Sequence, residues 1–226
     1  IPLKAGYQVR EDVLLRINTM GVVQPLSFRT EGNLDARMRL LSFTFDLHSS
    51  LFRFAARGTV NDQRLLLTAG MPGEEQKTEI ALPEPVHLSA GIFEYPAIAG
   101  LKAGETGILH VFDPAAMAAR PITVARAAAD EMILHQGRRV PARKYSLDFM
   151  GAAQFAWVGE DGAVLQEKGI LGITLTKVTK QEALQGIGRG ESFDLTQLAS
   201  IPVNREIPKP GDLTQLHVKL DNLGKS

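Results

Sequence analysis

Period-two alternation of apolar and polar residues is the feature that most constrains how this chain can fold. In Leu41–Leu47 every second residue is apolar and the residues between are polar. Successive side chains of a β-strand point to opposite faces, so this spacing predicts a strand with one buried face. The stretch Phe52–Val60 repeats the pattern after a short turn at residues 48–50. Together the two stretches predict a long β-hairpin.

Strand patterns continue along most of the chain. They occur at Leu26–Leu34, Arg64–Thr68, Gly107–Phe112, Ile122–Ala127, Met132–His135, Val140–Phe149, Gln154–Val158, Val164–Glu167 and Leu171–Val178. The connection Glu160-Asp161-Gly162 is typical of a hairpin turn, because glycine accepts a positive φ. About ten strands joined in sequence predict a mainly all-β fold, a curved antiparallel meander that forms a half-barrel or barrel. One or two short helices are expected, near Leu88–Phe93 and Gln181–Gln185.

The 226 residues are sufficient for one sizeable core. We predict a curved β-sheet domain over residues 1–185, followed by a connector over residues 186–226. Three glycines within Gly186–Gly190 raise the entropic cost of ordering this segment, and the prolines between 202 and 210 cannot donate to a central ladder. Leu213–Leu220 reads as one more strand, which we expect to lead toward a downstream domain.

Charge and composition argue against several functions. Lys plus Arg and Asp plus Glu are both 25, and the basic residues are scattered, which does not favour a nucleic acid or an anionic membrane surface. No apolar run approaches the ~20 residues that span a bilayer, so we expect no membrane-spanning segment. The absence of cysteine excludes disulfides, thiolate metal sites and a cysteine nucleophile within these residues. The chain begins at Ile1 without a signal-peptide pattern, as a processed or trimmed chain would.

No motif predicts catalysis, a metal or a cofactor. The five histidines lie far apart and form no HExxH pattern. A Ser-His-Asp set can be drawn from Asp46, His48 and Ser49 or Ser50, but no GxSxG elbow accompanies it. The glycines of Gly186–Gly190 lack the preceding strand and the Lys-Ser/Thr ending of a phosphate loop. We therefore predict no catalytic residue, no metal site and no cofactor.

Aromatic residues at strand positions form the one set that could bind a ligand. The set is Phe43, Phe45, Phe52, Phe54, Phe155 and Trp157. In one interpretation these side chains are the core of the curved sheet. In the other they line a cavity for an apolar ligand, because few helices are available to cover the concave face. Alternation predicts that all of them except Phe155 build this concave face.

Short motifs follow one another in a fixed order between Leu41 and Leu184. They are the Leu41–Val60 hairpin, Ile80-Ala81-Leu82-Pro83-Glu84-Pro85-Val86, Val111-Phe112-Asp113-Pro114, Arg139-Val140-Pro141-Ala142, Ala156-Trp157-Val158-Gly159-Glu160-Asp161-Gly162, Gly169-Ile170-Leu171-Gly172 and Glu182-Ala183. This order resembles the region that precedes the catalytic domain in bacterial transglutaminase-like cysteine peptidase proteins. The chain ends about where such a protein would enter its peptidase domain, so no catalytic residue of that family carries over.

The resemblance implies a non-catalytic accessory domain of a bacterial envelope protein, in the periplasm or cell envelope. Such a domain would position a downstream transglutaminase-like domain or an envelope partner. The strand-rich profile, with its hairpin at Trp157–Gly162, also resembles periplasmic half-barrel proteins that shelter a lipid or a lipoprotein acyl chain. An alternative function is therefore a carrier or sensor of an apolar ligand, and an enzyme with an unrecognised site is a third.

Overall fold

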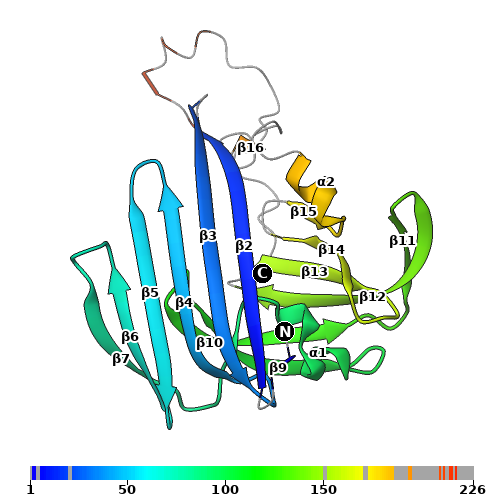
Figure 1. Cartoon of the computed structure of the whole chain (residues 1–226). Coiled ribbons are helices and arrows are strands. Elements are labelled where there is room, and N and C mark those ends of the chain that lie inside the picture. Colours follow the sequence, from blue (N-terminus) through cyan, green and yellow to red (C-terminus); the bar gives the residue numbers. More distant parts are fainter. Residues whose placement is uncertain are drawn as a thin grey trace.

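Two curved β-sheets form the body of the molecule (Figure 1). The computed structural model describes residues 2–3, 6–19, 22–149, 152–169, 173–185, 193–194, 209, 211, 214–215 and 217. Almost all of the strand pairs are antiparallel, which confirms the mainly all-β, half-barrel-like prediction. Most of the expected connector, and all of the expected strand at Leu213–Leu220 except residues 214, 215 and 217, lie outside the described residues.

The first sheet contains the N-terminal strands in sequence order. Its strands are β1 (Pro2–Leu3), β2 (Gly6–Thr19), β3 (Val22–Asp35), β4 (Leu40–Ser49), β5 (Arg53–Asn61), β6 (Arg64–Gly70) and β7 (Gln76–Ala81). A further short strand, β16 (Phe193–Asp194), pairs in parallel with β2. The hairpin predicted from residues 41–60 is β4 and β5, and the ladder between β3 and β4 shifts register between Asn33 and Leu34.

The second sheet contains the later strands. Its strands are β8 (His87–Leu88), β9 (Thr106–Asp113), β10 (Ala118–Arg126), β11 (Glu131–His135), β12 (Arg138–Phe149), β13 (Ala152–Val158), β14 (Val164–Lys168) and β15 (Thr174–Thr176). Strand β8 pairs in parallel with β9, and β11 pairs with β12 outside the main order. The helical elements are η1 (Ile92–Glu94), α1 (Pro96–Ala99) and α2 (Lys180–Gln185).

The division into two sheets differs from the single meander that alternation predicts. The meander stops after β7, where Pro83 and Pro85 provide no N–H for a further ladder. The chain then crosses to the second sheet. At this crossing the Leu40 N–H donates a hydrogen bond to the Val86 carbonyl at 2.8 Å. Strand β2 was also missing from the prediction, although it pairs with β3 along its whole length.

Two smaller expectations are corrected or refined. The strand predicted at Gly107–Phe112 is β9, in which Ile108 is 68% exposed while Val111 and Phe112 are buried. Only the end of β9 that meets the core is covered. The helix expected at Leu88–Phe93 begins a few residues later, as η1 and α1, with Pro96 at the first position of α1, where its missing N–H costs nothing. The helix expected at Gln181–Gln185 is α2.

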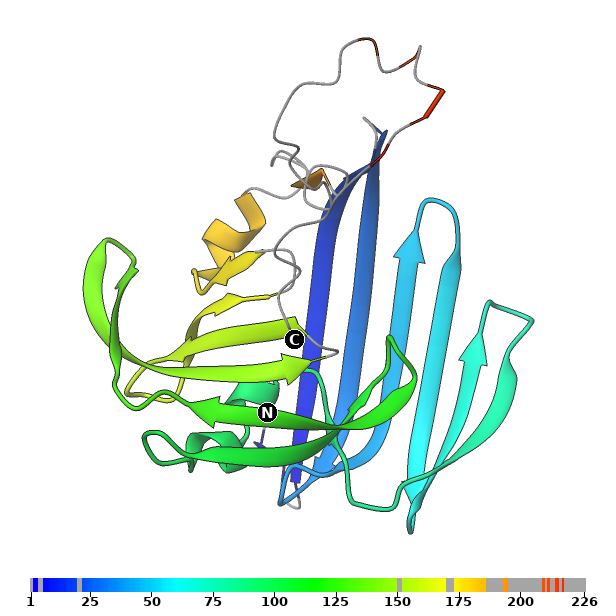
Figure 2. The same cartoon turned by 180° about the vertical axis from the view of Figure 1, so that it is seen from behind.

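The core lies where the two sheets cross. Seen from behind, the green strands of the second sheet run across the blue strands of the first (Figure 2). Phe43 of β4 is 3% exposed, and its ring lies 5.0 Å from the ring of Phe112 of β9 between centroids. Gly58 of β5 makes room for this ring, because a Cβ there would lie 2.4 Å from Phe43 Cε1. In the described part of the chain, no helix is long and apolar enough to cross a membrane.

Candidate functional site: a cleft between the two sheets

A cleft of about 630 Å³ opens between the first and second sheets. Strands β2, β3 and β4 supply one wall, while β12, β13, β14 and the end of β9 supply the other. The segment Ser89–Glu94, between β8 and α1, contributes to its edge. Binding sites for small ligands commonly enclose ~300–1,000 Å³, so the cleft has the size of a ligand site.

Strand register sets the first wall. Glu11 of β2 lies opposite Thr30 of β3, and Thr30 lies opposite Phe45 of β4. Residues that face each other across antiparallel strands point to the same side of the sheet. A carboxyl group, a hydroxyl group and an aromatic ring therefore lie side by side on the wall, and Phe28 lies beside Phe45 with ring centroids 6.1 Å apart.

Five acidic residues line the cleft. Four come from separate elements, namely Glu11 of β2, Glu94 of η1, Asp113 of β9 and Glu167 of β14, and the fifth, Asp12, follows Glu11 on β2. Burial raises the pKa of Glu11 above its usual value, and the charge of Asp113 raises it further. Burial also raises the pKa of Glu167, with smaller contributions from Glu11 and Glu94.

Apart from Asp12, which pairs with Arg10 and Arg29, the cleft carboxyl groups form no ion pair with a basic side chain in the described part of the chain. Arg10 belongs to the lining, but its Nε lies 2.9 Å from Asp12 Oδ2 and 3.6 Å from Glu31 Oε1. Alternation along β2 places Arg10 and Asp12 on the face opposite to Glu11. The ion pairs near the cleft therefore form on the outer face, around Asp12. Among the described residues Glu11, Glu94 and Glu167 have no ion-pair partner, and Asp113 Oδ1 accepts a hydrogen bond from the Ala115 N–H at 2.9 Å.

Thr30 is the buried polar residue of this wall. It is 3% exposed, and its side chain hydrogen-bonds to none of the described residues. The Thr30 hydroxyl is not one of the fully enclosed, unpaired polar atoms of the described residues. Because Thr30 lines the cleft, its hydroxyl oxygen can accept a hydrogen bond from a group that enters there.

Tyr95 fixes the segment at the edge of the cleft. Its hydroxyl donates to the Leu88 carbonyl at 2.7 Å and lies 3.1 Å from the Ala90 carbonyl. The Tyr95 side chain is buried, which raises the pKa of its hydroxyl and keeps it neutral. These contacts hold Phe93 and Glu94 against the cleft.

The structure brings together half of the predicted aromatic set. Phe43 and Phe45 are each 3% exposed, and Phe54 packs against Phe45 with ring centroids 6.4 Å apart. Phe52 is 46% exposed, since it lies at the β4–β5 turn just before the strand resumes. Its expected place on the covered face is therefore wrong.

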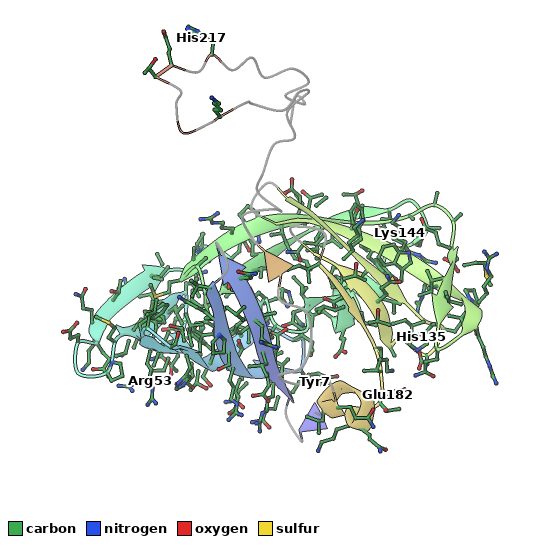
Figure 3. The ribbon with its side chains drawn as sticks, turned by 90° about the horizontal axis from the view of Figure 1, so that it is seen from above. Tyr7, Arg53, His135, Lys144, Glu182 and His217 are labelled. Atoms are coloured by element: carbon green, nitrogen blue, oxygen red, sulfur yellow. The ribbon has the colours of Figure 1, made fainter. Side chains whose placement is uncertain are left out.

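Phe155 and Trp157 lie on the other face of the second sheet. Their neighbour Ala156 on β13 faces the core and is fully buried. Trp157 Nε1 donates to Glu131 Oε2 at 2.8 Å, and Lys144 Nζ lies 5.3 Å from the Trp157 ring centroid. Seen from above, Lys144 lies on the curved second sheet (Figure 3). Trp157 therefore does not belong to the concave face with Phe45, and whether any of the six aromatic residues binds a ligand stays a prediction.

The alternative sites weighed from the sequence find no support in the geometry. Ser49 Oγ accepts hydrogen bonds from the N–H groups of Leu51 and Phe52, both at 3.1 Å, so the hydroxyl closes the turn. Among the described residues, no group of three or more His, Asp or Glu side chains is arranged to hold a metal ion. Gly186–Gly190 lies outside the described residues.

Sequence reasoning missed the residues that give the cleft its polar character. Glu11, Thr30 and Glu167 were not singled out. The sequence does contain a signal for Glu11. Val9 and Val13 lie two residues before and after it, so Glu11 is the one carboxylate among apolar residues on that face of the strand. For Glu167 no local signal exists, since its approach to Glu11 depends on how the sheets cross.

The fold and the cleft place the chain in a broad class, the two-sheet, half-barrel-like β-proteins. No family model matches the sequence, and no curated protein matches it. Among solved structures the chain is similar to a DUF1089 family protein from Pseudomonas aeruginosa, with 13% identity and a TM-score of 0.44 over 78% of this chain and 94% of that chain. It is also similar to a β-barrel-like protein of the domain of unknown function DUF1849 from Brucella abortus, with 12% identity and a TM-score of 0.47 over 72% of this chain and 75% of that chain. These likenesses concern overall architecture and carry no functional argument.

Proposed function

We propose that this chain is a non-catalytic binding domain that takes a ligand with an apolar body into the cleft between its sheets. The cleft itself is the observation that carries the proposal. Elsewhere the two sheets pack closely, as Phe43 does on Phe112, but beside Phe28 and Phe45 they leave about 630 Å³. Removing apolar surface from water contributes roughly 25 cal/mol per Å², so an apolar ligand would gain affinity chiefly by covering the partly exposed Phe28, since Phe45 is only 3% exposed.

The non-catalytic part of the proposal has separate support. The chain has no cysteine, and the Ser49 hydroxyl of the drawn Ser-His-Asp set is engaged in a turn. The cleft offers acidic and apolar side chains in place of a nucleophile beside a base. Binding accounts for this lining without a reaction.

A cleft-filling variant tests the proposal. Ser89 lines the cleft, so Ser89→Trp should fill part of it, whereas Thr44→Trp on the exposed face of β4 should leave it open. We expect the wild-type chain and Thr44→Trp to bind the apolar dye N-phenyl-1-naphthylamine saturably, and Ser89→Trp to lose this binding. Thermal unfolding of each variant controls for folding. Absence of saturable dye binding by the wild-type chain, or equal binding by both variants, contradicts the proposal.

For cellular context we propose an accessory role in the bacterial envelope, beside a transglutaminase-like domain or another envelope partner. The motif order between Leu41 and Leu184 supports this role. The reading frame on both sides of the segment tests it. We expect a secretion signal upstream and a transglutaminase-like domain downstream or in a neighbouring frame. A frame without a secretion signal contradicts the envelope location.

A further inference from the structure

We propose that the cleft is selective for a primary ammonium group carried on an apolar body, with Glu11 and Glu167 as counter-ions and the Thr30 hydroxyl as an additional acceptor. This inference rests on the proposed function, since it specifies the ligand of the same cleft. It goes further because an apolar cleft alone would not distinguish a cationic ligand from a neutral or an anionic one.

The first argument is the order of groups along the wall. Glu11, Thr30 and Phe45 follow one another across three paired strands and face the same side. Directly opposed residues have Cβ atoms about 4.5–5.5 Å apart, so the carboxyl group, the hydroxyl group and the ring form a continuous surface. This surface is polar at β2 and apolar at β4. A ligand with a charged head and an apolar body matches that gradient.

The second argument is the convergence of negative charge from the facing sheet. Glu167 lies opposite Ala156, whose side chain faces the core, and lines the cleft together with Glu11. Asp113 and Glu94 extend the acidic lining at the edge. Among the described residues none of the four forms an ion pair with a basic side chain. Carboxylates that share a partly buried site repel one another, and a cation placed between them relieves the repulsion.

The third argument is the Thr30 side chain. It is 3% exposed, lines the cleft and hydrogen-bonds to none of the described residues. A primary ammonium group has three N–H donors and no acceptor, so two carboxylates and one hydroxyl oxygen would satisfy it. This observation does not depend on the number of acidic side chains in the cleft.

Size and geometry favour an organic cation over a metal ion. No cluster of carboxylates and histidines in the described part of the chain is close enough to coordinate a metal. The cleft, at about 630 Å³, is much larger than an ion and is lined by rings such as Phe28 and Phe45. An alkylammonium ligand would use both the charge and the rings.

Isothermal titration calorimetry with three probes of equal chain length tests the inference. The probes are decylammonium, decanol and decanoate, each below its micellar concentration at pH 7.5. We expect decylammonium to bind at least about tenfold more tightly than decanol, and decanoate to bind more weakly than both. Equal affinities for the three probes overturn the selectivity but leave the apolar binding function standing. If no probe binds, the proposed function fails as well.

Variants locate the selectivity. In Glu11→Gln and Glu167→Gln we expect the affinity for decylammonium to fall about tenfold and the affinity for decanol to stay unchanged. Thr30→Val should lower the affinity for decylammonium by a smaller factor. Glu160→Gln, in the exposed turn before β14, is the matched control and should change neither affinity. A loss in Glu160→Gln as large as in Glu11→Gln would overturn the inference, because the effect would then come from the total charge of the protein.

Discussion

The inner face of the first sheet changes character along a single row of paired residues. At β5 the row contains Ala56, which is part of the core. At β2 and β3 it contains Glu11 and Thr30, which line the cleft, and between them Phe45 of β4 belongs both to the core and to the cleft wall. Pairing is continuous along the row, so the first sheet does not cause the difference. The difference arises because the second sheet packs closely on one half of the row and leaves a cleft over the other half. Core and site can therefore share one face of a sheet.

The closed half should respond most strongly to mutation. Phe43→Ala removes a ring that packs on Phe112, with 5.0 Å between centroids, and should lower the free energy of unfolding by about 3–5 kcal/mol. Urea denaturation measures the loss. Phe52→Ala, at a ring 46% exposed, is the matched control and should change the free energy by no more than about 0.5 kcal/mol. Similar losses in the two variants would mean that the core is placed wrongly.

Adding volume to the closed half should also destabilise the protein. A Cβ at Gly58 would lie 2.4 Å from Phe43 Cε1 and 2.8 Å from Leu65 Cδ1. Gly58→Ala should therefore cost about 1–3 kcal/mol of stability, since both neighbours are buried and cannot move freely. In Gly107→Ala the new Cβ would lie 3.4 Å from Leu101 Cδ2, an ordinary contact, and we expect no comparable loss. A neutral Gly58→Ala would indicate that the two sheets pack loosely here.

The open half should gain stability when its charge is removed. Burial raises the folded-state pKa of Glu11 above the reference value of 4.5, so the ionised carboxylate opposes folding at pH 7. The stabilisation from protonation is complete below the unfolded pKa and is lost as the pH rises through the folded pKa. Glu11→Gln should therefore be more stable than wild type at pH 7, and the difference should vanish below pH 4.5. Thermal unfolding across this pH range measures it, and a destabilised Glu11→Gln at pH 7 would contradict the picture of an uncompensated cleft carboxylate.

Outside the cleft, Glu131 should show a small effect of the opposite sign. Hydrogen bonds from Trp157 and Lys144 lower its pKa, so its contribution to stability is present above pH 4.5 and is lost as the pH falls through the folded pKa. Glu131→Gln should cost about 0.2–1 kcal/mol at pH 7, because the pair lies at the surface. Denaturation at pH 7 and again below the folded pKa should show the cost disappear at the lower pH.

Much of the local structure follows from residues adjacent in sequence. Alternation in Leu41–Leu47 predicts β4 and the buried side of Phe43 and Phe45. The expected burial of Leu41 is wrong, because the ladder shifts register opposite the start of β4, so that Leu41 is 47% exposed and Leu40 is buried instead. The turn before β14 follows from Gly162, whose φ is 81°, a conformation that glycine adopts without a steric cost. The helical turn at Gln181–Gln185 was also predictable. The sequence prediction missed β2, although the residues from Tyr7 to Leu15 show the alternation of a strand.

The sequence by itself determined most of the strands, their turns and the alternation of side chains between the two faces of a strand, because these depend on backbone geometry and on residues a few positions apart. Only the tertiary structure decided which face of each strand is covered. The rings of Phe155 and Trp157 obey the alternation on β13, yet they lie outside because Ala156 takes the inner side. The cleft, too, was decided by the tertiary structure. Glu11 and Glu167 come from opposite ends of the described domain, and the crossing of the two sheets, which no local pattern encodes, brings them to the same cavity.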